Sequence, residues 1–138
     1  MRKVHARETM IESLRKSIVI ITDNQRYSVA ITYDINSDED DPVPIIAAKG
    51  EGTVSGWINH EAENVGIDLF ESPFLACMLF ISTDLGQEIS RDHYYPVAQV
   101  IAFVVQSRYA NDYRLRKPKP DKYILRNMGM NIKTALHN

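Results

Sequence analysis

Two histidines with neighbouring carboxylates are the side chains of this 138-residue sequence best suited to acid–base or metal chemistry. They are His60 with Glu61 and Glu63, and His93 with Asp92 and Asp84. Histidine exchanges protons near neutral pH and a carboxylate can orient its ring, so either group is a candidate centre for a small enzyme. Neither has a second histidine at ligand spacing. A surface helix is therefore the simpler interpretation of His60, and the charged start of a helix that of His93.

Cys77 is the only cysteine, which excludes an internal disulfide and a cysteine-rich metal site. It lies between Ala76 and Met78 in an apolar run, so we expect an inert, buried thiol. The sequence also has no phosphate-binding glycine loop and no nucleophile elbow. We therefore predict no cofactor and no metal.

A polar tetrad, Asp23-Asn24-Gln25-Arg26, separates two apolar runs. β-Branched residues dominate residues 17–22, and larger side chains alternate with small or polar ones over residues 27–33, so both runs are predicted strands. The tetrad is then a tight turn between them, a role that suits its composition. Asn24 can in principle cyclise at its own bond to Gln25, but nothing in the sequence marks that bond as activated.

The elements that follow include two more strands and three helices. They are a strand over residues 43–48 that closes at Lys49-Gly50, a helix over 53–64, a short strand over 67–70, a helix from Ser72-Pro73 through Phe80, and a helix from Arg91 to about residue 107 with Ser90 as its cap. In the first helix four side chains are expected to face inward: Val54, Trp57, Ile58 and Ala62. This order predicts an α/β fold in a single domain, with a small mixed four-stranded β-sheet surrounded by helices.

The composition, with 44% hydrophobic and 25% charged residues, is that of one globular domain. Its longest apolar runs, residues 18–21 and 74–81, are far shorter than the roughly 20 residues of a transmembrane helix. The N-terminus has a positive start but no apolar stretch behind it, unlike a signal peptide. We therefore expect the chain to stay in the cytoplasm.

The net charge of −2 is distributed unevenly. Residues 1–16 carry five basic and two acidic side chains, residues 17–107 carry three and fourteen, and residues 108–138 carry eight and two. We accordingly divide the chain into a linker or N-terminal helix, a central domain and a basic C-terminal tail. The basic arms either solvate the surface or lie near an anionic membrane, whose head groups bind basic segments. Nucleic acid is a poor partner, because the acidic central domain repels phosphates.

Three segments, in order and at matching separations, resemble the FlhB/YscU family of type III secretion export-switch proteins. They are residues 18–34, where the family shows a strand, an Asn-Pro-Thr-His motif and a strand ending in tyrosine; residues 44–50, an apolar strand closing on Lys-Gly; and residues 62–76, a helix end, a short strand and a Pro-x-Leu-Ala helix start. Residues 95–102 extend the likeness, which covers about residues 7–107.

The resemblance implies a cytoplasmic domain that hangs from a membrane part beneath the export gate, at the cytoplasmic face of the bacterial inner membrane. There it takes part in recognising secretion substrates and in switching specificity, with export-gate and other apparatus proteins as partners. The chain is expected to be this domain, cut after the membrane part, or a free-standing homologue. The alternative is a small cytosolic α/β enzyme that uses His60 or His93 with nearby carboxylates.

In the family, the asparagine of the motif attacks its own carbonyl and breaks the Asn-Pro bond, a self-cleavage rather than turnover of a substrate. Asp23 stands at that position with a carboxylate that is ionised near neutral pH and leads to a strained anhydride instead of a succinimide. Asn24 removes the proline ring that restrains the turn. Arg26 replaces the histidine and cannot exchange protons near pH 7. We therefore expect no catalytic residue and no self-cleavage.

Overall fold

The computed structural model describes residues 2–35, 37–38, 42–110 and 116–128. Its elements in chain order are α1 (Arg2–Arg15), β1 (Val19–Asp23), β2 (Tyr27–Thr32), β3 (Ile45–Glu51), α2 (Thr53–Asn64), β4 (Leu69–Glu71), α3 (Pro73–Ser82), the 3₁₀ turn η1 (Arg91–His93), α4 (Tyr94–Ala110) and α5 (Pro120–Asn127). Residues 111–115 and 129–138 of the predicted basic tail lie outside the described residues. None of the helices within the described ranges combines the length and the apolar character of a transmembrane span.

One four-stranded sheet forms the centre of the molecule, in the order β3-β2-β1-β4. β1 pairs antiparallel with β2, β2 pairs antiparallel with β3, and β4 runs parallel to β1. β3 and β4 therefore point the same way, which requires a crossover between them, and α2 provides it. The prediction of a mixed four-stranded sheet in a single α/β domain is confirmed.

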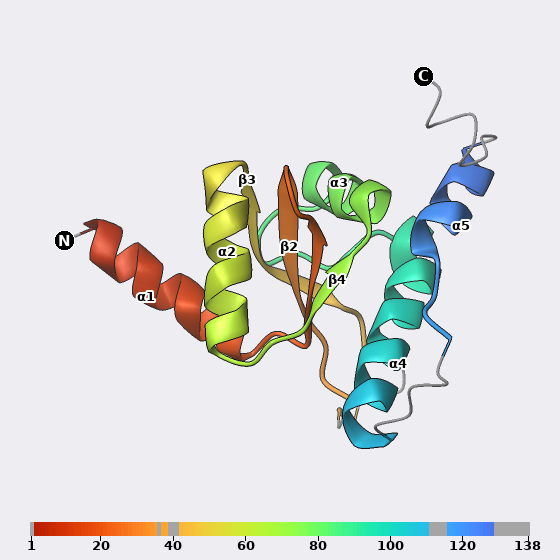
Figure 1. Cartoon of the computed structure of the whole chain (residues 1–138), viewed down its shortest axis with the longest axis horizontal. Coiled ribbons are helices and arrows are strands. Elements are labelled where there is room, and N and C mark those ends of the chain that lie inside the picture. The colour runs from red at the N-terminus through yellow and green to blue at the C-terminus, as the bar shows by residue number, and fades with distance from the viewer. Residues whose placement is uncertain (1, 36, 39–41, 111–115, 129–138) are drawn as a thin grey trace.

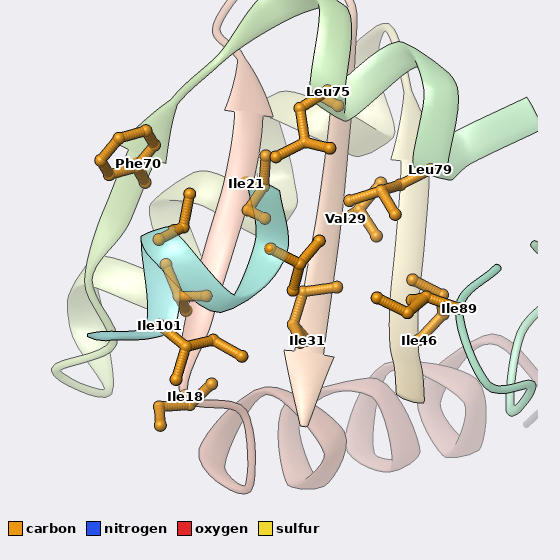
Figure 2. Packing of buried hydrophobic residues seen from close by; sticks show 14 of the residues in the cluster. Ile18, Ile21, Val29, Ile31, Ile46, Phe70, Leu75, Leu79, Ile89 and Ile101 are labelled. Atoms are coloured by element: carbon orange, nitrogen blue, oxygen red, sulfur yellow. The ribbon is translucent and has the colours of Figure 1, made fainter. Parts of the chain in front are cut away.

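Helices cover both faces of this sheet, with α1 and α2 on one side and α3 and α4 on the other (Figure 1). Alternate strand residues face opposite sides, so two clusters of buried side chains result. The small cluster, on the α2 side, comprises Leu14, Ile20, Ala30, Ala48, Ile58 and Ala62. The large cluster, on the α3–α4 side, includes Ile21, Val29, Ile31, Ile46, Leu75, Leu79 and Ile101 (Figure 2).

An irregularity in β3 lets this strand contribute to both clusters. Ala30 pairs with Ala48 and Ile31 with Ile46, so Ala47 is an extra residue on β3, a β-bulge. Without the bulge, Ile46 and Ala48 would face the same side of the sheet. With it, Ile46 enters the large cluster and Ala48 the small one.

Two burial expectations were wrong in part. Val54 is 44% exposed, whereas Ile58 and Ala62 on the same helix are buried. Val54 lies against Gly50 of β3, which has no side chain to cover it. Cys77 is half-buried rather than fully buried, and it packs against the large cluster from its position on α3.

The two predicted serine caps also differ from expectation. Ser72 occupies the N-cap position of α3, but its side chain makes no capping bond. The Leu75 N–H that it would accept donates instead to a carboxylate of α5, to which the Ser72 hydroxyl also donates. Ser90 accepts the Asp92 N–H and so caps η1, the short turn that precedes α4. Ser90 is therefore a cap, but of η1 and not of the long helix α4.

Candidate functional site at the β1–β2 hairpin

The tetrad forms the turn between β1 and β2, as predicted. Asp23 is the last residue of β1 and pairs with Tyr27, the first residue of β2. The Arg26 N–H donates to the Asp23 carbonyl over 2.9 Å and closes the turn. Asn24, Gln25 and Arg26 are exposed and Asp23 is half-buried. The four residues therefore lie at the surface, at one end of the sheet.

The Asp23 side chain folds over this turn. Its carboxylate oxygen Oδ1 accepts the Gln25 N–H over 3.3 Å. A bond from a side chain to the amide two residues further on is an Asx turn, which Asp and Asn both form. The side chain of residue 23 therefore stabilises the turn as an acceptor, and it carries no nitrogen that could act as a nucleophile.

Arg26 joins the hairpin to the start of α2. Its carbonyl accepts the Gly52 N–H over 2.8 Å, and its guanidinium lies 5.2 Å from the centre of the Tyr27 ring. Gly52 has a φ of 63°, which glycine adopts without steric cost, and so the chain can turn here from β3 into α2. The Arg26 backbone thus fixes the hairpin, while its guanidinium offers hydrogen-bond donors and no acceptor.

A buried polar network lies beneath the hairpin on the α2 side, and sequence reasoning missed it. It consists of Thr22 of β1, Ser28 of β2, and Ser55 and Asn59 of α2; we call it the hydroxyl network. Ser28 Oγ donates to Asn59 Oδ1 over 2.7 Å and lies 2.6 Å from Ser55 Oγ. Asn59 Nδ2 donates to Thr22 Oγ1 over 3.1 Å. The three hydroxyl residues are buried, so these bonds replace bonds to water.

The donors of the hydroxyl network can be assigned without conflict. Ser28 gives its proton to Asn59, so Ser55 donates to Ser28. Thr22 has one hydroxyl proton and two acceptors within reach, Ser28 Oγ at 2.8 Å and the Tyr27 carbonyl at 3.0 Å. Donation to Ser28 gives every side-chain pair of the network one donor, since Asn59 Nδ2 donates to Thr22. A satisfied buried network holds one arrangement of its elements. It therefore fixes β1 and β2 to α2 directly below the tetrad.

On the other face of the sheet, Lys49 caps the end of α3 beside the hairpin. Its Nζ donates to the carbonyls of Phe80 over 2.9 Å and Thr83 over 3.0 Å. A cation is favourable at a helix C-terminus, where carbonyls lack helical partners. The Phe80 ring in turn packs on Tyr27, with ring centroids 4.8 Å apart. Lys49 of the Lys-Gly segment thus ties β3 to α3.

The two histidines that the sequence singled out are not brought together. His60 is exposed on α2, whereas His93 is half-buried in η1, before the helix that covers the opposite face of the sheet (Figure 1). Burial lowers the pKa of His93, and Asp92 acts in the opposite direction. Among the described residues no three His, Cys, Asp or Glu side chains form a metal-binding group. This arrangement provides no centre that both histidines share.

An apolar hollow of about 350 Å³ lies between α4 and the chain that connects β2 to β3. Its lining residues are Tyr33, Ile35, Pro42, Pro44, Tyr94, Ala98, Ile101, Ala102 and Val105. Ile35 is 49% exposed, and Ala98 and Ala102 are exposed on α4. An accessible apolar concavity of this kind suits contact with an apolar group or an apolar protein segment.

Comparison with known proteins gives consistent matches. Residues 1–104 match the model of the FlhB HrpN YscU SpaS family. Flagellar biosynthetic protein FlhB of Aquifex aeolicus is 35% identical over 100 residues, which are 72% of this chain but only 28% of that protein. The cytoplasmic domain of FlhB from Shewanella putrefaciens is similar with a TM-score of 0.67 and 31% identity, over 79% of this chain and 86% of that domain. An asparagine-to-aspartate mutant of the EscU C-terminal domain gives a TM-score of 0.69 and 25% identity, over 75% of this chain and 93% of that one.

Proposed function

Because the chain belongs to the FlhB HrpN YscU SpaS family, we propose that it is a binding and switching module of a bacterial type III or flagellar export apparatus. It recognises secretion substrates and contacts export-gate and other apparatus proteins. Joined to a membrane part, it lies at the cytoplasmic face of the inner membrane. The observation that supports this proposal best is the family match, together with the fold that the chain shares with the cytoplasmic domain of FlhB.

Within this proposal the chain has three parts. Residues 17–107 form the export-switch domain, residues 1–16 are the linker or N-terminal helix, and residues 108–138 are a basic tail. Exposed basic side chains on both arms supply a contact to anionic lipid head groups: Arg15, Lys16, Arg116, Lys117, Lys119, Lys122 and Arg126. Sedimentation with phosphatidylserine vesicles tests this contact, with phosphatidylcholine vesicles as the control. Equal binding to both kinds of vesicle would contradict it.

The module does not cleave itself. The Asp23 carboxylate accepts the Gln25 N–H, and no proline restrains residue 24. The guanidinium of Arg26 is a donor only and cannot accept a proton as an imidazole can. Electrospray mass measurement of the chain after prolonged incubation at neutral pH is expected to give one intact mass. Two fragments separated between residues 23 and 24 would overturn this part of the proposal.

We assign the apolar hollow beside α4 to the binding of apolar segments of partner proteins. Its exposed positions allow a charge to be introduced without disturbing the large cluster, so Ala98→Glu is the informative variant. Glutamate there puts an ion on an apolar surface and opposes binding of apolar groups. Gln106→Glu, also exposed on α4 but outside the lining of the hollow, is the matched control.

A pull-down with purified export-gate proteins and candidate secretion substrates tests the binding function itself. We expect capture by the native chain and by Gln106→Glu, and at least tenfold weaker capture by Ala98→Glu. Capture of no component by the native chain would contradict the proposed function. Equal capture by both variants would contradict only the assignment of the hollow.

A further inference from the structure

The C-terminal helix α5 has an amphipathic sequence but is too short to be stable alone. It spans eight residues, Pro120–Asn127, and isolated helices shorter than about 12 residues are marginal in water. Pro120, Ile124 and Leu125 are buried, whereas Lys122 and Arg126 are exposed. Its helical state therefore depends on the surface against which it packs.

That surface is formed by α3 and α4, along which α5 lies (Figure 1). Ile124 is 5% exposed and belongs to the large cluster, and Leu125 is 1% exposed. Tyr123 packs on Tyr95 of α4 with ring centroids 4.9 Å apart. Just before the helix, Lys117 Nζ lies 5.1 Å from the centre of the Phe70 ring. The buried face of α5 therefore packs on an apolar surface of α3 and α4 with aromatic side chains at its edges. We call this surface the seat.

One carboxylate provides the polar contacts of this seat. Asp121 Oδ1 accepts the Leu75 N–H over 2.9 Å and the Ser72 hydroxyl over 2.6 Å. Leu75 lies in the first turn of α3, whose N–H groups have no partner within the helix. A carboxylate is favourable there because of both the free N–H and the helix dipole. Asp121 therefore caps a helix from a position 46 residues away in the chain.

We propose that the seat between α3 and α4 is a helix-docking site. α5 is its releasable occupant, which we call the latch, and Asp121 makes the polar contacts of the latch. The latch is outside the region that matches the family model, which ends at residue 104. The latch is attached through its buried apolar side chains, the Tyr123 ring and Asp121, and it packs on α3 and α4 without pairing with any strand of the sheet. Its detachment therefore leaves the strand pairing intact. Release uncovers the apolar seat and the Leu75 N–H together. The site then fits a short amphipathic helix with an acidic residue in its first turn. This inference is independent of the proposed export function.

The test uses the full chain and a fluorescent peptide of residues 116–128. Asp121→Asn weakens the resident latch, because an amide is a poorer partner for the Leu75 N–H and for the Ser72 hydroxyl than a carboxylate. The peptide with its native Asp121 then competes for the seat. We expect it to bind Asp121→Asn at least tenfold more tightly than the native chain in fluorescence anisotropy. The same peptide with asparagine at that position is expected to bind neither chain.

Hydrogen exchange on the same proteins shows whether α5 opens by itself, as a latch does, or only together with the core. In Asp121→Asn, amides of residues 74–76 and 121–127 are expected to exchange at least tenfold faster, with no change in β1 and β2. Asp84→Asn, an exposed carboxylate in the chain after α3, is the control and should leave both segments unchanged. Exchange of α5 only together with the sheet, or failure of the native peptide to bind Asp121→Asn, would overturn the proposal.

Discussion

The helices on the two faces of the sheet contact the β1–β2 hairpin through different kinds of interaction. On the α3–α4 face the contact of the hairpin is apolar, because Tyr27 packs on Phe80 and belongs to the large cluster. On the α2 face the same end of the sheet carries the hydroxyl network of Thr22, Ser28, Ser55 and Asn59. Apolar contacts are not directional, whereas a network of hydrogen bonds specifies one position. The first face therefore supplies most of the stability, and the second sets the position of the hairpin.

Removing a side chain from the large cluster should have the largest effect. Leu79 is fully buried on α3, and Leu79→Ala leaves a cavity among the side chains that surround it (Figure 2). We expect the free energy of unfolding to fall by about 2 to 5 kcal/mol, measured by urea titration. Ile81→Ala on the same helix, where the side chain is 65% exposed, is the control and should change it by less than about 0.5 kcal/mol. Similar losses for both would contradict the assignment of stability to this face.

Breaking the hydroxyl network should have an intermediate effect. Asn59→Ala leaves the buried Ser28 hydroxyl without its acceptor and Thr22 without a donor. We expect a loss of about 1 to 3 kcal/mol in the free energy of unfolding, and faster hydrogen exchange at residues 22–28. Asn64→Ala, at the exposed end of α2, is the matched control. An exchange rate at the hairpin that is unchanged in Asn59→Ala would show that the network does not position it.

The smallest effect is expected from His93, and it depends on pH. Because burial lowers its pKa in the folded chain, protonation favours the unfolded state, whose histidines titrate near 6.5. Stability should therefore fall as pH drops through about 6.5 toward the lower folded pKa, and this part of the loss should disappear in His93→Gln. His60→Gln, an exposed histidine on α2, serves as the control in urea titrations at pH 7.5 and 5.5. A pH dependence that is identical in native chain and His93→Gln would refute the assignment.

Local patterns in the sequence predicted most of the fold. The strands around the tetrad follow from their β-branched and alternating residues, and α3 follows from Ser72-Pro73. The hydroxyl network had a local signal, since Thr22 and Ser28 are polar residues next to the tetrad. That signal did not show what they would meet, because their partners on α2 lie 27 to 37 residues away.

Long-range contacts account for what could not be predicted. The cap of α3 was expected from Ser72, the adjacent serine, but comes from Asp121. No local rule connects a helix start with a carboxylate in another helix. Similarly, Lys49 was predicted to mark the end of a strand, and only the packing of β3 against α3 shows that it caps the carbonyls of Phe80 and Thr83. Both contacts depend on tertiary structure, which the sequence pattern does not contain.

The central proposal is that the tetrad at the turn of the hairpin does not support self-cleavage, in a fold shared with the FlhB cytoplasmic domain. Rebuilding the family motif tests it directly, through a variant with Asp23→Asn, Asn24→Pro, Gln25→Thr and Arg26→His. In that variant the side-chain nitrogen of residue 23 can attack its own carbonyl carbon, the peptide bond to residue 24 breaks, and the released proline nitrogen takes the proton. Intact-mass measurement is expected to show two fragments for the variant and a single mass for the native chain. Cleavage of the native chain, or an intact variant whose hairpin amides remain protected, would contradict the claim.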